Sequence, residues 1–332
     1  MYSEAGPSID RSIDMHHSSH SAPALTAAAF LLASLAAAVA VASAARRPRP
    51  RRRWDRETFD AAGAGGTKAI AEVKGERYAR IEVVDETATG RGMGRCLVID
   101  GRRQFCELDE HRHHEMLVHF PCAFLGPDRP RRALVVHGGD CLALRELLRY
   151  DDTLEEVVLL EEDERVLEVC ERHLGARSTR GTGDARVKWM FGPTADSVSR
   201  LVADDGGEGG RLQAFDLIVV DGKERAGAQV SPQTARDLRL LLSPEGVVVV
   251  CGGTVGVSSA FEQMPSKVVY SFYSETHDAQ TRMTAYSPVD LASRDEASAE
   301  GAGRHAPRLL AAGGVRFFDA LQLWSYVPWF LR

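Results

Sequence analysis

Three acidic residues stand where side chains often do chemistry in proteins with a parallel sheet. Asp140, Glu161 and Asp221 each follow a short apolar run, Asp140 after an intervening His-Gly-Gly. Such runs are typical of buried parallel strands, whose carboxyl ends meet at the edge of the sheet where ligands bind. Carboxylates at that edge can accept hydrogen bonds from ribose hydroxyls, hold a cation or act as a general base.

The stretch between the first two of these acids indicates how they are positioned. An apolar run leads into Gly138, Gly139 and an acid, an amphipathic stretch follows, and a second apolar run ends at Glu161. The order strand, tight turn, helix, strand is the first half of a doubly wound nucleotide-binding sheet. Because glycines let the backbone approach a ligand closely, we expect both glycines to contact a nucleoside-bearing ligand. Leu142 and Ala143 stand where a dinucleotide-binding loop needs glycine, which counts against NAD.

A histidine-rich segment, 111–119, raises the question of a metal. His114, Glu115 and His119 are spaced His-Glu-x-x-x-His, one residue longer than the zinc-protease motif. Five residues at about 100° per step place the two histidines about 140° apart around a helix. We therefore expect one or two of these histidines to face a cleft, the others to be solvated, and no metal site.

Charge and composition describe a globular protein with an acidic body. The chain has 332 residues, room for about two domains of ~150 residues, and a hydrophobic fraction of 44%. Six of its 41 basic residues lie within 46–53, which leaves 35 basic against 47 acidic residues elsewhere, a balance of −12. This balance argues against nucleic acid as a partner and suits a cationic substrate, although it serves solubility equally well.

The six cysteines form no Cys-x-x-Cys pair. Four of them, Cys96, Cys106, Cys170 and Cys251, lie in apolar or amphipathic runs. In a chain of this length the pattern predicts free thiols in a reducing compartment, with neither a zinc site nor a disulfide.

Residues 24–45 form a candidate transmembrane helix. These 22 residues carry no charge, include twelve alanines and are followed at once by the arginine-rich stretch. A helix of that length is about 33 Å long, enough for a hydrocarbon core of roughly 30 Å. We expect a single-pass anchor with the body on the cytoplasmic side. A cleaved signal peptide and a transit peptide remain alternatives, which the acids of the preceding tail disfavour.

The rest of the chain is expected to divide into parts in a simple order. After the tail 1–23 and the anchor come a basic stretch with a linker at 46–74, a small antiparallel β-domain with a helix at 75–125, a Rossmann-like domain at 126–290, and a polar loop with an apolar C-terminal segment at 291–332. In the β-domain, Asp100-Gly101 predicts a hairpin turn. The helix is expected from about Asp109 to Phe120, closed by Pro121.

Short motifs follow one another along residues 75–255. They are Tyr78-x-x-Ile81, Leu97-Val-Ile-Asp-Gly101, Gln104, Asp109-Glu110, His114-Glu115-Met116, His119-x-Pro121, Gly138-Gly139-Asp140, Leu144-Arg145-Glu146, Glu161-x-Asp163-x-x-Val166, Asp184-x-Arg186-Val187 and Phe215-Asp216 to Asp221. Each motif is weak alone, but their order resembles that of spermidine synthase and its polyamine aminopropyltransferase relatives.

The resemblance implies a β-domain followed by a Rossmann-like domain that binds decarboxylated S-adenosylmethionine as co-substrate, without a metal or other cofactor. An amine nitrogen attacks the aminopropyl carbon next to the sulfonium, and methylthioadenosine leaves. Alkylamines have a pKa near ~10, so the nucleophile must lose a proton and carboxylates must hold its cationic form. The resemblance also suggests a homodimer.

Matched position by position, the resemblance implies one general base and several substrate contacts: Asp221 as the base, Asp140 at the aminopropyl end, Glu161 at the ribose, and Gln104 and His114 in the substrate pocket. Glu224, three residues beyond the base, is expected to hold the far amine of the acceptor.

Several positions depart from the family pattern. Ala79 replaces a glutamine, His113 replaces a tyrosine, His137 replaces the first glycine of the loop, and Lys223 adds positive charge beside Glu224. Three interpretations follow: an active aminopropyltransferase with an unusual acceptor, a catalytically silent binding or scaffold protein, and an S-adenosylmethionine-dependent methyltransferase on the same sheet.

Overall fold

The computed structural model describes residues 68–88, 92–126, 128–174, 181–205, 214–222, 230–252, 260–274, 276–277, 279–289 and 291. The expected anchor at 24–45 and Glu224 lie outside these ranges. Among the described helices, none has both the length and the apolar character needed to cross a bilayer.

A four-stranded antiparallel sheet, in the order β1-β2-β3-β4, confirms that an antiparallel sheet precedes the parallel strands. Its strands are β1 Lys68–Val73, β2 Ile81–Asp85, β3 Arg95–Ile99 and β4 Arg102–Cys106. Asp100 and Gly101 turn the chain between β3 and β4 with positive φ angles of 50° and 75°, as an Asp-Gly hairpin requires. Residues 68–73 were expected to end the linker and instead pair with β2, because Ile70 and Val73 pack on the core of this sheet.

Cys96 and Cys106 are joined by a disulfide, so the prediction of free thiols is wrong for this pair. The hairpin sets the two residues directly opposite each other on β3 and β4, with their Cα atoms 4.1 Å apart. The other four cysteines are buried thiols: Cys122, Cys141, Cys170 and Cys251.

A seven-stranded mixed sheet, in the order β10-β11-β9-β8-β5-β6-β7, confirms the predicted doubly wound architecture. Its parallel strands are β5 Arg132–Val136, β6 Glu156–Glu161, β7 Val187–Phe191, β8 Phe215–Asp221 and β9 Leu242–Cys251, and its antiparallel strands are β10 Ser266–Ser274 and β11 Ala279–Ser287. The chain builds outward from β5 to β7 and then returns to build β8 and β9 on the other side. The strand order therefore reverses between β5 and β8, the place where sheets of this kind bind ligands.

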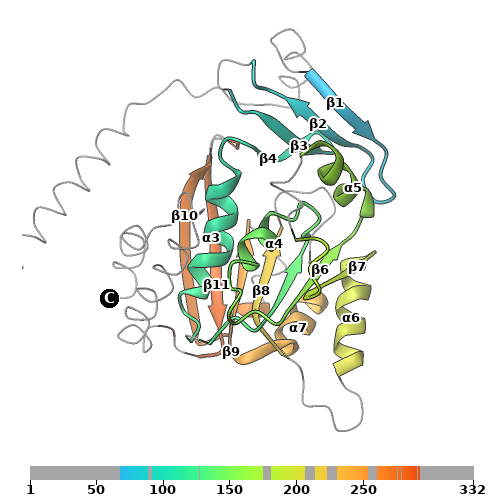
Figure 1. Ribbon diagram of the computed structural model, residues 1–332. Helices are drawn as coiled ribbons and strands as arrows, with labels where there is room; N and C mark the ends of the chain where they lie inside the picture. The colour runs from blue at the N-terminus through green and yellow to red at the C-terminus, as the bar shows by residue number, and fades with distance from the viewer. Residues whose placement is uncertain are drawn as a thin grey trace, which may run out of the picture. The chain divides into compact units, whose positions relative to one another are not determined.

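Helices cover both faces of the large sheet (Figure 1). One face packs against α3 Glu110–Cys122 and α4 Leu142–Leu147, and the other against α6 Thr194–Asp205 and α7 Pro232–Leu240. Alternate residues of the central strands supply the two cores, with Val135 on the first face and Leu134 on the second. Among the described residues, one further helix, α5 Glu164–His173, packs on the small sheet.

Helix α3 differs from its expected place in two respects. It continues through Pro121 to Cys122, and it packs on the seven-stranded sheet although the sequence grouped it with the β-domain. Its apolar residues, such as Leu117 and Phe120, are fully buried in that core. The histidines of α3 are thereby fixed relative to the carboxyl edge of the sheet.

Candidate active site

Three buried carboxylates lie at the carboxyl edge of the large sheet. Asp140 follows β5, Glu161 ends β6 and Asp221 ends β8, and these three strands are neighbours. The exposed fractions of the residues are 3%, 0% and 5%. Burying a carboxylate is unfavourable unless it is hydrogen-bonded or paired with a cation, so the partners of these groups define the site.

Backbone N–H groups hold the Glu161 carboxylate. Its Oε2 accepts a hydrogen bond from the Gly139 nitrogen at 3.0 Å, and its Oε1 accepts from the nitrogens of Glu162 at 2.9 Å and Asp163 at 3.3 Å. A Cβ atom at position 139 would lie 2.6 Å from Oε2 of Glu161, so only glycine permits this approach. At position 138 a Cβ would lie 2.8 Å from a methyl carbon of Leu159. Glycine at 139 is thus required by its protein neighbours, and a side chain at 138 would displace Leu159.

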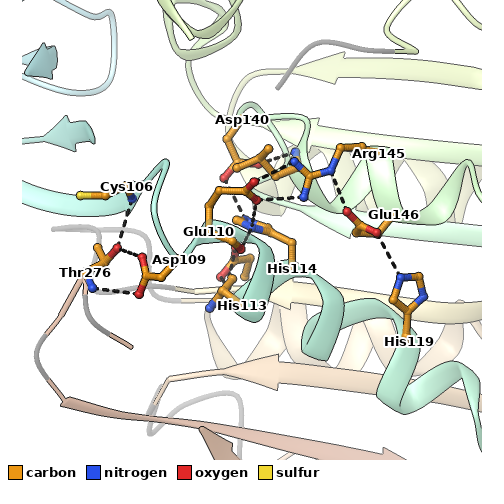
Figure 2. Close-up of polar contacts among 12 residues, drawn as sticks. Cys106, Asp109, Glu110, His113, His114, His119, Asp140, Arg145, Glu146 and Thr276 are labelled. Carbon is orange, nitrogen blue, oxygen red and sulfur yellow. Dashed lines mark hydrogen bonds and ion pairs between the residues drawn. The ribbon is translucent and has the colours of Figure 1, made fainter. Parts of the chain in front are cut away.

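Asp140 faces His114 of α3. Oδ1 of Asp140 accepts from the Leu142 nitrogen at 3.0 Å, and Oδ2 lies 3.7 Å from Nε2 of His114. On the far side of the imidazole, Nδ1 lies 2.6 Å from the backbone oxygen of Glu110 (Figure 2). Because a carbonyl oxygen only accepts, Nδ1 carries the donated proton and Nε2 is the ring atom directed toward Asp140.

Asp221 is paired with His113, the residue next to His114. Nε2 of His113 lies 3.1 Å and 3.2 Å from the two oxygens of the Asp221 carboxylate. An ionised carboxylate only accepts, so Nε2 donates and fixes the orientation of Asp221. The sequence analysis named both residues but did not predict that they are partners, because they lie 108 residues apart along the chain.

A buried chain of ion pairs begins at Glu110, beside His114, and ends at His119 (Figure 2). The two terminal nitrogens of Arg145 donate to the Glu110 carboxylate at 3.0 Å and 2.8 Å, and Nε donates to Glu146 at 2.7 Å. Nε2 of His119 lies 3.1 Å from the second oxygen of Glu146. Burial opposes ionisation, but hydrogen bonds from His114 and Arg145 hold the pKa of Glu110 well below its usual range. In the same way burial is outweighed at Glu146, where His119 and Arg145 lower the pKa to about 2.

Asp109, which precedes α3, ties that helix to other elements. Its carboxylate accepts hydrogen bonds from the Thr276 nitrogen at 2.9 Å and the Ser274 hydroxyl at 3.1 Å, and also from the Thr276 hydroxyl. The same hydroxyl accepts from the Cys106 nitrogen at 3.2 Å (Figure 2). The start of the histidine-bearing helix is therefore fixed between β4 and the end of β10.

Asp163 joins the small sheet to the segment that follows Glu161. Its Oδ1 caps α5 through the Arg165 nitrogen, and its Oδ2 accepts from the nitrogens of Arg77 at 2.8 Å and Tyr78 at 3.3 Å. The sequence identified Asp163 only as part of a motif, and the structure gives it a connecting function.

Of the other two predicted substrate contacts, Gln104 and Glu224, the structure describes only Gln104. Gln104 lies on β4, is buried, and donates from its amide to the backbone oxygen of Arg102 at 3.1 Å. Glu224 is outside the described residues, so its predicted role stays a prediction. The structure therefore brings together Asp140, Glu161, Asp221 and His114 at one edge and adds His113 to them.

Comparison with known proteins identifies the family. Residues 110–268 match the family model of the spermine/spermidine synthase domain. The polyamine aminopropyltransferase of Halorhodospira halophila is 33% identical over 199 residues, 59% of this chain and 66% of that protein. The polyamine aminopropyltransferase of Archaeoglobus fulgidus is 32% identical over 175 residues, 52% of this chain and 57% of that protein. The matched region thus spans between about half and two thirds of these curated relatives.

The fold agrees with that assignment. The crystal structure of spermidine synthase from Thermotoga maritima aligns with a TM-score of 0.62 and 20% identity, covering 79% of this chain and 84% of that one. A spermidine synthase in complex with the transition-state analogue AdoDATO aligns with a TM-score of 0.63. By its matched domain and its similarity to these relatives, this chain belongs to the spermine/spermidine synthase family.

Proposed function

We propose that this protein is a polyamine aminopropyltransferase, which transfers the aminopropyl group of decarboxylated S-adenosylmethionine to an amine acceptor. The observation that carries the proposal is the set of three buried carboxylates, Asp140, Glu161 and Asp221, at the strand ends around the switch point. The family assignment and the relatives' names support the same reaction.

The nucleoside end of the co-substrate is assigned to Glu161. Three backbone N–H groups hold its carboxylate in a single orientation, so its remaining lone pairs are directed before the ligand arrives. A ribose hydroxyl that donates to this carboxylate gains a charge-assisted hydrogen bond. Asp140 would accept from the ammonium group of the aminopropyl arm.

Asp221 is assigned as the general base. The acceptor nitrogen bonds to the aminopropyl carbon while the carbon–sulfur bond breaks, the bonding electron pair stays on sulfur, and the nitrogen loses one proton to Asp221. A carboxylate with a pKa near ~4 is a weak base toward an alkylammonium ion, so the amine must be desolvated and its pKa lowered in the pocket. The hydrogen bond from His113 holds the carboxylate in position for that transfer.

Product analysis tests the proposal against its two alternatives. The full-length protein is incubated with decarboxylated S-adenosylmethionine and a panel of diamines and polyamines, and in parallel with S-adenosylmethionine. We expect methylthioadenosine and an acceptor lengthened by one aminopropyl group from the first mixture, and no methylated product from the second. Methylated acceptor would establish a methyltransferase, and nucleoside binding without any product would favour the silent binding protein.

We also infer that residues 24–45 anchor the protein in a membrane with the catalytic domain on the cytoplasmic side. The uncharged run of 22 residues and the six arginines that follow it support this inference, whereas the Cys96–Cys106 disulfide, a bond that is rare in reducing compartments, argues against the cytoplasmic side. Carbonate extraction and protease protection of tagged protein test it, and cleavage after Ala44 would refute it. The homodimer implied by the resemblance stays a prediction, which sedimentation of the purified protein checks.

A further inference from the structure

We propose that His113, His114 and Asp221 form a binding site for a divalent transition-metal ion, with Zn²⁺ as the ion that best suits these donors. One ligand atom from each of the three side chains lies within 4.8 Å of the other two, and all three residues are buried. Two imidazole nitrogens and a carboxylate oxygen are a donor set that zinc and similar ions bind in proteins.

The closest pair in this group already has the spacing of two neighbouring metal ligands. Nε2 of His113 and Oδ1 of Asp221 are 3.1 Å apart, and on metal binding Nε2 gives up the hydrogen that it donates to Asp221 while the ring carries its proton on Nδ1. Two ligands bonded at about 2.1 Å to one ion are separated by roughly 3.0 to 3.4 Å when they are adjacent and by about 4.2 Å when they are opposite. Because zinc is tetrahedral and has no opposite positions, a separation of 4.8 Å must close by about 1.4 Å when the ion binds.

His114 is oriented as a metal ligand usually is. Its Nδ1 donates to the backbone oxygen of Glu110 at 2.6 Å, which fixes the ring and leaves Nε2 as the coordinating atom. Metal-binding histidines in proteins commonly donate their second ring nitrogen to a carbonyl or carboxylate in this way. Glu110 is itself held by Arg145, so the support of the ring is rigid.

The charge around the group also favours a cation. Oδ2 of Asp140 lies 3.7 Å from Nε2 of His114, so a second carboxylate stands beside the group. Asp140 and Asp221 together supply two negative charges in a buried setting, which a divalent ion neutralises.

The site has a consequence for activity, and this consequence rests on the proposed function. A metal ion bound to Asp221 would occupy the lone pair that the amine's proton requires. Metal and acceptor amine should therefore exclude each other, and the metal-loaded protein should be inactive in aminopropyl transfer.

Zinc titration of the full-length protein tests the site directly. His16, His17 and His20 are replaced by alanine throughout, so that histidines of the N-terminal tail do not bind the ion. Competition with a chromophoric chelator should then give one Zn²⁺ per chain. His113→Gln, which keeps a donor for Asp221, and Asp221→Asn should each weaken binding by about 100-fold or more, beyond the range for loss of a supporting hydrogen bond.

His173→Ala is the matched control, because this histidine lies in the last turn of α5 and outside the group. It should leave zinc affinity unchanged. X-ray absorption of the zinc-loaded protein with an intact site needs no site variant and should show two imidazole ligands. Zinc binding below one ion per chain, or affinity that is the same with and without His113 and Asp221, overturns the proposal.

Aminopropyl transfer is measured on the same samples. Activity that falls in proportion to bound zinc and returns with excess chelator supports both proposals. A protein that binds zinc through these residues but forms no methylthioadenosine in chelator refutes the proposed function and leaves the metal site standing. An active protein that binds no zinc refutes the metal site and leaves the proposed function standing.

Discussion

Replacing Glu161 by glutamine tests how the structure prepares the nucleoside site. The carboxylate is fully buried and accepts three backbone hydrogen bonds, two through Oε1 and one through Oε2. A glutamine amide has the same shape but offers an acceptor on only one side. The side chain must therefore place its NH₂ group against at least one backbone N–H.

The least unfavourable arrangement keeps the amide oxygen on the nitrogens of Glu162 and Asp163. The NH₂ group then faces the Gly139 nitrogen, so one hydrogen bond is lost and a buried donor has no acceptor there. We expect the free energy of unfolding to fall by about 1 to 3 kcal/mol. Loss of the charged acceptor for the ribose should weaken nucleoside binding by a similar amount, roughly 5- to 150-fold in Kd.

Calorimetry with methylthioadenosine and denaturant unfolding measure the two effects separately. Glu156→Gln is the matched control, since Glu156 begins the same strand at the opposite edge of the sheet, where it pairs with Arg132. Nucleoside affinity should be unchanged in the control. A folded Glu161→Gln protein that binds methylthioadenosine as tightly as the wild type would remove Glu161 from the site.

Three further predictions follow from the same contacts. Gly139→Ala should lower both thermal stability and nucleoside affinity, because its Cβ would lie 2.6 Å from Glu161, whereas Gly183→Ala, with no atom within 4 Å, should change neither. Because the folded pKa of Glu146 is about 2 against an ordinary 4.5, its contribution to stability is complete above pH 4.5 and is lost as the pH falls toward 2. Urea unfolding across that range should show the loss in the wild type and a weaker pH dependence in Glu146→Gln. Reduction of Cys96–Cys106 should lower the free energy of unfolding by about 2 to 3 kcal/mol for a loop of about ten residues, and a Cys96→Ser/Cys106→Ser double variant should not respond to reductant.

Much of the fold could be predicted because its signals are local. The strands around Val135, Leu159 and Val219 are continuous apolar runs, which only a sheet covered on both faces accommodates. The acids that end those strands then had to meet at one edge, as Asp140 and Glu161 do. The turn at Asp100-Gly101 was equally predictable, because the positive φ angles of such a turn favour the pair Asp-Gly.

The features that the sequence analysis failed to predict have different physical causes. The strand 68–73 lacks a strong alternating pattern and is stabilised by the sheet that it joins. The Cys96–Cys106 bridge was not deducible from the turn alone, because a regular two-residue turn at Asp100-Gly101 sets Cys96 opposite Phe105, and a bulge shifts the register by one residue. The contact between His113 and Asp221 was not deducible, since it depends on how α3 packs across the sheet.

Methylthioadenosine release by the wild type and by Asp221→Asn is the most direct test of the proposed reaction. Both full-length proteins are freed of metal with chelator and given saturating decarboxylated S-adenosylmethionine and the best acceptor amine. If Asp221 is the general base, kcat should fall by about 100-fold or more in the variant, while calorimetric nucleoside affinity stays close to that of the wild type. Full turnover by a folded Asp221→Asn protein would contradict the assignment of the base, and absence of turnover by the wild type with every amine would contradict the proposed function.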